Sequence, residues 1–224
     1  MSKKLLVIAR DYWGTVKAVE TATKFSIFMK QNIGVSDVKE ITGDFVTRTQ
    51  IMMAIEEFVE SVNCEPDSVG YIYMAGHGNQ INDNGDSEDD GCDEVYSLPD
   101  GNITDYWLIC VLKKYTNHSS IIVLISDHCC SGSMLDTKEN SAKWISIGSS
   151  LDHEDSYASG DGNVMTITLL DYLKSLNIEE LKSLTPRILK EKLHEGMQTS
   201  FIGDLQHVSV HASGYDCWDF SLFR

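Results

Sequence analysis

The sequence has no long apolar run, no pair of cysteines at CxxC spacing and no excess of basic residues. The apolar stretch Leu5–Ala9 is too short for a signal peptide or a membrane-spanning helix. Without CxxC pairs, a zinc site is not expected. There are 34 acidic but only 18 basic residues, and the net charge of −16 argues against nucleic acid and anionic membranes as partners.

Cysteine is present but is not arranged for disulfide bonds. The six cysteines are Cys64, Cys92, Cys110, Cys129, Cys130 and Cys217. Only Cys129 and Cys130 are close in sequence, and adjacent cysteines rarely pair with each other. This distribution is typical of a reducing compartment, so we expect a cytoplasmic protein. The length of 224 residues and the apolar content of 42% suit one domain with one full core.

Short apolar runs alternate with helical patterns along the chain. We expect strands at Leu5–Ala9, Val38–Ile41, Gly70–Ala75, Ile121–Ser126, Trp144–Gly148 and His207–Ala212. We expect helices at Val16–Gln31, Arg48–Val62, Thr104–Tyr115, Asn163–Leu176 and Thr185–Gln198, with Thr104 and Thr185 as N-caps. This order predicts βαβ units, and therefore an α/β fold whose mostly parallel sheet is covered by helices on both faces.

Two segments interrupt this alternation. Gly78–Asn102 is rich in Asp, Asn and Gly and is expected to be a long loop. Gly132–Lys143 is expected to be a second loop, at a seam between a larger and a smaller portion of the fold. Long loops in compact domains tend to carry function or to move, so both segments are candidates for a site.

A histidine and a cysteine follow two of the predicted buried strands. His77 lies in Ala75-Gly76-His77-Gly78, and Cys129 follows Ser126-Asp127-His128. The two residues are 52 positions apart, in the order and spacing of a caspase-type cysteine peptidase. Parallel strands carry chemistry at their carboxyl ends, so we expect the two side chains to act together.

The expected chemistry assigns a role to each residue. Cys129 attacks as a thiolate, and His77 accepts its proton and later protonates the leaving amine. The N–H groups of Gly78 and Cys129 are candidate donors to the oxyanion. The remaining histidines are read as structural: His118, His128, His153, His194, His207 and His211.

Four segments, in their order along the chain, resemble a metacaspase: Tyr71–Gly78, Asn84–Glu94, Pro99–Gly101 and Asp127–Ser133. The resemblance implies a caspase-like α/β/α sandwich and hydrolysis after Arg or Lys, commonly with calcium. It also implies that Cys129 is the nucleophile and that Asp127 binds the substrate.

Three positions depart from the family pattern. Cys130 stands where the family usually has histidine. Ala75 replaces a serine of the basic-residue pocket, and an ungapped alignment puts Phe25 at the position of an early pocket aspartate. Asp127 is then the one acid left in the pocket. A guanidinium can still bind one carboxylate, but discrimination is expected to be poorer than the family norm.

The segment before Pro99 is strongly acidic. Within twelve residues it holds Asp83, Asp86, Glu88, Asp89, Asp90, Asp93 and Glu94. Two interpretations stay open: a solvated acidic loop, or a contribution to a calcium site built from separate segments. The resemblance matches Asp93, Asp105 and Asp136 to the family's calcium ligands, and Tyr106 replaces the fourth acid.

We therefore expect one caspase-like domain over residues 1–224. It would consist of a larger portion over residues 1–137, a short linker loop over 138–145 and a smaller portion over 146–224. The expected function is that of a monomeric cysteine endopeptidase acting on peptides or proteins with basic residues, with calcium as a candidate cofactor. The alternative is a caspase-like pseudoenzyme or interaction module with little or no peptidase activity.

Overall fold

The computed structural model describes residues 1–11, 17–82, 91–115, 119–135 and 142–224. Its centre is a six-stranded sheet in the order β11-β8-β7-β3-β1-β2. The strands are β1 (Lys3–Ala9), β2 (Asp37–Thr42), β3 (Val69–Ala75), β7 (Ile121–Asp127), β8 (Trp144–Gly148) and β11 (Ser209–Ala212). Neighbouring strands are parallel except β11, which runs antiparallel to β8. The predicted mostly parallel sheet is confirmed.

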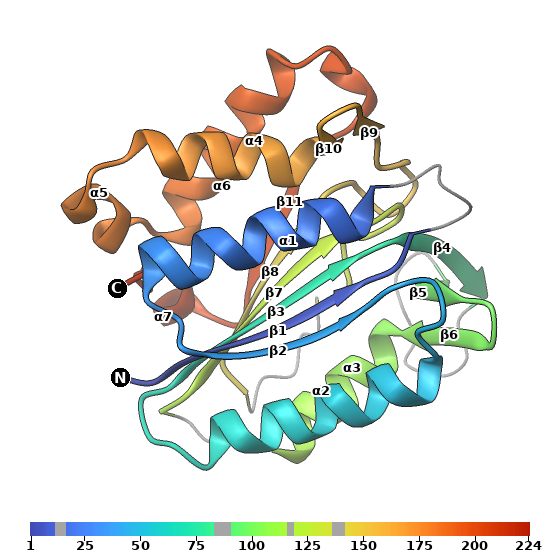
Figure 1. Ribbon diagram of the computed structural model, residues 1–224, viewed down its shortest axis with the longest axis horizontal. Coiled ribbons are helices and arrows are strands. Elements are labelled where there is room, and N and C mark those ends of the chain that lie inside the picture. Colours follow the sequence, from blue (N-terminus) through green and yellow to red (C-terminus); the bar gives the residue numbers. More distant parts are fainter. Residues whose placement is uncertain (12–16, 83–90, 116–118, 136–141) are drawn as a thin grey trace.

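Helices cover both faces of this sheet (Figure 1). One face carries α1 (Ala18–Phe28), α4 (Val164–Ser175) and α6 (Pro186–Gln198), and the other carries α2 (Arg48–Asn63) and α3 (Asp105–Lys114). Alternate residues of β1 enter the two cores: Leu5 and Val7 pack on the α1 side, and Leu6 and Ile8 pack on the α2 side. A strand buried on both faces is apolar throughout, which explains the continuous run in the sequence.

Side-chain caps fix where α2, α3 and α6 begin. Thr104 and Thr185 accept backbone hydrogen bonds at the starts of α3 and α6, as predicted. Thr47 starts α2 in a capping box. The first helix runs further than predicted, because a π-helical turn (η1, Met29–Ile33) continues α1. It ends at Gly34, whose φ of 74° lies in the left-handed region.

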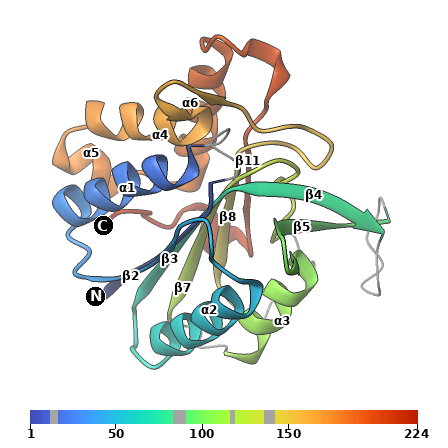
Figure 2. The ribbon, with the colours of Figure 1, turned by 45° about the vertical axis from the view of Figure 1, so that its right-hand side comes forward.

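The prediction of a loop over Gly78–Asn102 is wrong for the residues of this segment that the structure describes. They belong to a three-stranded antiparallel sheet of β4 (His77–Asn82), β5 (Cys92–Leu98) and β6 (Gly101–Thr104). Figure 2 shows β4 and β5 projecting beyond the carboxyl end of β3, away from the main sheet. The polar composition concealed these strands, because Asp93 and Glu94 are buried where the sequence pattern suggested a solvated loop.

Several short elements near the C-terminal half were also not predicted. They are β9 (Ala158–Ser159), β10 (Gly162–Asn163), α5 (Ile178–Ser183), η2 (Gly203–Leu205) and α7 (Tyr215–Trp218). Segments of two to six residues are too short to show a clear period in the sequence. The described residues include no helix long and apolar enough to cross a membrane. The division of the domain at the linker loop 138–145 stays a prediction.

The core depends on aromatic packing between α1 and β3. Phe25 is fully buried, and its ring stacks on Tyr73 with ring centroids 4.6 Å apart. Phe25→Ala is expected to lower the free energy of unfolding by about 3–5 kcal/mol, because it leaves a cavity under α1. Ile27→Ala is the control on the same helix: Ile27 is 47% exposed, and its loss should change stability by less than about 1 kcal/mol. Urea unfolding measures both, and equal losses would contradict this account of the core.

Candidate active site

The carboxyl ends of β3 and β7 bring the two predicted chemical segments to one edge of the sheet. The strands are adjacent and parallel, and Ala75 is the register partner of Asp127. His77 and Cys129 each follow this pair by two residues. The register therefore places the two segments at the same end of the sheet, although they are far apart in sequence.

Close packing of the backbone joins the two strand ends. A Cβ atom added to Gly78 would lie 1.9 Å from the carbonyl oxygen of Cys129 and 2.2 Å from Nδ1 of His128. These distances are far below van der Waals contact, so no other residue fits at position 78 without displacing the turn after β7. The glycine places its backbone against Cys129, the residue expected to carry the nucleophilic thiol.

The Cys129 thiol is half-buried and receives one backbone donor. The N–H of Ser156 donates to Sγ at 3.3 Å. Burial raises the pKa of Cys129, the Ser156 N–H lowers it, and the charge of Asp155 raises it. The net direction is upward, so near neutral pH the group is a thiol that must lose its proton when it attacks.

His77 has the protonation state that a base requires. It is half-buried at the start of β4, and burial lowers its pKa below 6.5, with a further contribution from the positive charge of Arg10. The Arg10 guanidinium is held in place by the carbonyl oxygen of Asp44, at 2.9 and 3.0 Å. At neutral pH the imidazole is therefore uncharged and able to accept a proton.

Cys130 is in a different environment from Cys129. Its φ of 52° lies in the left-handed region, which is uncommon for a residue other than glycine. Its N–H donates to the carbonyl oxygen of Glu154 at 3.0 Å. Burial, with the nearby Cys129 and Glu94, raises the pKa of Cys130 to about 11. A thiol with so high a pKa is almost never a thiolate at neutral pH, and this favours Cys129 as the nucleophile.

His128 is a buried structural histidine, in agreement with the interpretation from sequence. Nδ1 lies 2.9 Å from the carbonyl oxygen of Cys129, and the ring meets Tyr96 edge-on with centroids 5.4 Å apart. Nε2 is buried without a hydrogen-bond partner among the described residues. Burial lowers the pKa of His128 to about 4.

Asp127 is enclosed by hydrogen-bond donors. It is fully buried, Ser156 Oγ donates to Oδ1 at 3.2 Å, and both the N–H (3.2 Å) and the hydroxyl of Thr166 donate to Oδ2. Asn163 also donates to the main-chain carbonyl of Asp127 at 3.2 Å. Burial raises the pKa of this carboxyl, while these donors lower it. The predicted contact of Asp127 with substrate stays a prediction, and Phe25 lies in the core instead of beside it.

The segment after β8 supplies site residues that the sequence analysis did not single out. Ser149 donates from its hydroxyl to the carbonyl oxygen of His128 at 3.0 Å, and its N–H donates to the Ser131 hydroxyl at 2.9 Å. Gln206 donates to the Ser149 carbonyl at 2.7 Å. A signal was available, because Ser149 directly follows a predicted strand whose neighbour in the sheet is β7.

Two of the three expected calcium ligands lie near each other. Asp93 on β5 and Asp105 at the start of α3 are both buried, and Asp105 Oδ2 accepts the N–H of Glu94 at 3.2 Å. Asp136 lies outside the described residues. Within the described ranges no group of three or more His, Cys, Asp or Glu residues could hold a metal ion. These residues alone therefore do not make a calcium site.

The buried His128 predicts a loss of stability in acid. A histidine in the unfolded chain titrates near 6.5, so between about 6.5 and 4 the unfolded state binds more protons than the folded state. The free energy of unfolding contributed by this group should therefore fall by about 2 kcal/mol from pH 7 to pH 5. His128→Gln should lose this share of the pH dependence, and the matched change at the exposed His153 should keep it. Urea unfolding at the two pH values tests this, and equal slopes in all three proteins would refute it.

Comparison with known proteins supports the fold. The family model for the metacaspase, peptidase C14 domain matches residues 3–138, more than half of the chain. No curated protein matches the sequence. Protein GSU0716 from Geobacter sulfurreducens is similar in structure, with a TM-score of 0.75 and 17% identity over 100% of this chain and 98% of that one. Caspase-1 from Spodoptera frugiperda has a TM-score of 0.65 and 9% identity over 93% and 85% of the two chains. At these identities the two structures support the fold alone, and the similarity to the caspase shows that this fold is caspase-like.

Proposed function

The chain belongs to the metacaspase family of C14 peptidases, and we propose that it is a cysteine endopeptidase whose catalytic dyad is His77 and Cys129. The family supports a cysteine peptidase in general. The observation that carries the proposal for these two residues is the β3–β7 register, together with the approach of Gly78 to the Cys129 carbonyl. Under this proposal, a histidine and a cysteine 52 positions apart act at one place because the strands that precede them pair.

The proposed reaction starts from an uncharged pair. His77 accepts the proton of the Cys129 thiol as sulfur attacks the peptide carbonyl, and the Ser156 N–H stabilises the developing thiolate. The N–H groups of Gly78 and Cys129 stabilise the oxyanion. The imidazolium of His77 then protonates the leaving amine. In the second step neutral His77 takes a proton from water, which hydrolyses the thioester and frees the thiol.

We propose substrates with Arg or Lys before the scissile bond. The chain's charge of −16 favours cationic partners. Because Asp127 already has donors from Ser156 and Thr166, a guanidinium that reached it would have to displace one of them. Discrimination in favour of basic residues through Asp127 alone should therefore be modest.

We also propose a cytoplasmic monomer. All six cysteines are free, which suits a reducing compartment. The edge strand β2 carries Lys39 and Glu40, which form ion pairs with Glu57 at 2.7 Å and Lys30 at 3.0 Å. Charged side chains on an edge strand disfavour pairing with the edge of another sheet.

Substitution of the two adjacent cysteines tests the dyad. Cys129→Ala and His77→Ala should each reduce peptide cleavage at least about 1,000-fold, because each removes a group that takes part in bond breaking. Cys130→Ala should keep most of the activity and serves as the matched control. Initial rates on a peptide library measure the effect. If Cys130→Ala is inactive while Cys129→Ala cleaves, the nucleophile is the other thiol. If the folded wild type cleaves nothing, the non-catalytic alternative takes the place of this proposal.

Calcium is proposed as an activator that uses Asp93, Asp105 and Asp136, and no step of the reaction above passes through it. Carboxylates that repel one another become ordered when a cation binds them. Millimolar calcium should therefore raise the cleavage rate, and Asp105→Asn should abolish that increase. Asp171→Asn, at an exposed position on α4, removes the same charge and should keep it. Equal rates in calcium and in chelator, with no heat of binding in calorimetry, would remove the metal from the proposal.

A further inference from the structure

Glu154, Asp155 and Ser156 lie directly against the turn that follows β7. This turn carries Cys129 and Cys130 and is called the nucleophile turn. The Glu154 carbonyl accepts the N–H of Cys130 at 3.0 Å, and the Ser156 N–H donates to Sγ of Cys129 at 3.3 Å. Asp155 lies between these two points of contact. Its position beside the thiol is therefore set by backbone hydrogen bonds on both sides.

The structure holds this segment firmly. Glu154 Oε2 accepts the N–H groups of Leu151 at 3.2 Å and His207 at 2.9 Å. Ser156 is attached to the buried Asp127 through its hydroxyl. The side chain of Asp155 is thus presented from a fixed backbone.

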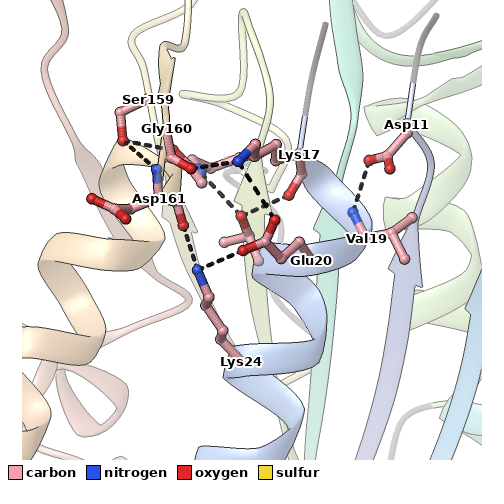
Figure 3. A network of polar contacts seen from close by, with 11 residues as sticks. Asp11, Lys17, Val19, Glu20, Lys24, Ser159, Gly160 and Asp161 are labelled. Carbon is pink, nitrogen blue, oxygen red and sulfur yellow. Dashed lines mark hydrogen bonds and ion pairs between the residues drawn. The ribbon is translucent and has the colours of Figure 1, made fainter. Parts of the chain in front are cut away.

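The hairpin of β9 and β10, which follows Ser156 in the chain, is attached to the first turns of α1, as Figure 3 shows. Lys24 donates to the carbonyl oxygen of Asp161 at 2.6 Å, and Lys17 donates to that of Gly160. Glu20 forms ion pairs with both lysines, at 3.7 Å to Lys17 and 2.9 Å to Lys24. The chain around Asp155 is therefore held at two places. Glu154 and Ser156 contact the nucleophile turn, and the hairpin that follows contacts α1.

Asp155 and Asp127 differ in accessibility. Asp155 is exposed, whereas Asp127 is fully buried and surrounded by donors. Burial raises the pKa of Cys129, and the Asp155 carboxylate raises it further through its charge and a hydrogen bond with the thiol, against the Ser156 N–H. The other acids at this turn, Glu94 and Asp152, act with Asp155 on the neighbouring Cys130. Asp155 is thus an exposed acid held beside the Cys129 sulfur by the backbone contacts of Glu154 and Ser156.

We propose that Asp155 is the specificity-determining acid of this chain, and that its carboxylate receives the basic side chain before the scissile bond in place of the enclosed Asp127. This inference rests on the proposed peptidase function. A bound guanidinium or ammonium would neutralise the Asp155 charge, which opposes formation of the Cys129 thiolate. A basic substrate would then be bound and would also activate the nucleophile that cleaves it.

Two thiol reagents test the proposal without requiring turnover. The first is a pair of peptidyl chloromethyl ketones that differ only in Arg against the uncharged citrulline at the reacting end. The second is iodoacetamide, which has no recognition group. Every protein in this test carries Cys130→Ala, so that Cys129 is the one cysteine at this turn, and mass spectrometry of the peptide that contains it separates its rate from those of the exposed Cys64 and Cys110.

Asp155→Asn should lower the preference for the Arg reagent and raise the rate with iodoacetamide. The ratio of the Arg rate to the citrulline rate should fall about tenfold, equivalent to ~1.4 kcal/mol. The iodoacetamide rate should rise, because no carboxylate opposes the thiolate. Asp161→Asn is the matched control: it removes an exposed charge from the same segment, and Figure 3 shows its carboxylate pointing away from the contacts of the hairpin. It should leave both rates within about twofold of the wild type.

The outcomes separate this inference from the proposed function. An unchanged Arg preference in Asp155→Asn overturns the inference, as does a wild type that labels equally with Arg and citrulline. Loss of the preference in folded Asp127→Asn, with retention in Asp155→Asn, returns the role to Asp127. A wild type that labels with Arg preference but hydrolyses no peptide refutes the peptidase proposal and leaves the assignment of Asp155 standing.

Discussion

The arrangement of the active-site edge depends on how closely the Gly78 backbone approaches the carbonyl oxygen of Cys129. The parallel pairing of β3 with β7 sets the two strand ends level, and the missing side chain at position 78 lets them meet. His128 fills the space beneath this contact, edge-on to Tyr96. The pairing of β3 with β7 and this close approach hold the start of β4, which carries His77, against the turn after β7, which carries Cys129.

A buried carboxylate organises the other wall of the site. Asp127 collects donors from Ser156 and Thr166, ten residues apart in the chain, and so ties both ends of the segment between them to the end of β7. An unpaired carboxylate at this depth would be strongly destabilising, so the donors are required for folding. Because its two oxygens already accept these hydrogen bonds, Asp127 is less available to a ligand than its position two residues before Cys129 suggests.

The sequence was sufficient to predict the strands of the main sheet and to place His77 and Cys129 directly after two of them. Continuous apolar runs such as Leu5–Ala9 and Ile121–Ser126 have one physical explanation, a strand buried on both faces. It was not sufficient for β4 to β6, because buried Asp93 and Glu94 carry no apolar period. For residues 149–156 one signal was available in the sequence, the position of Ser149 directly after a predicted strand. Most of the hydrogen bonds that the structure shows between these residues and residues 127–131 are made by main-chain groups and small hydroxyls, which a sequence pattern records poorly.

The position of the β9–β10 hairpin on α1 does not depend on which side chains the hairpin carries at its tip. Lys17 and Lys24 bind main-chain carbonyl oxygens, which every residue type provides. Substitutions at Gly160 and Asp161 would therefore leave the attachment in place. Gly162 is the exception, because a Cβ atom there would lie 2.2 Å from the Thr21 hydroxyl oxygen. The tip of the hairpin can therefore change in charge and size while the backbone that supports it keeps its attachment to α1.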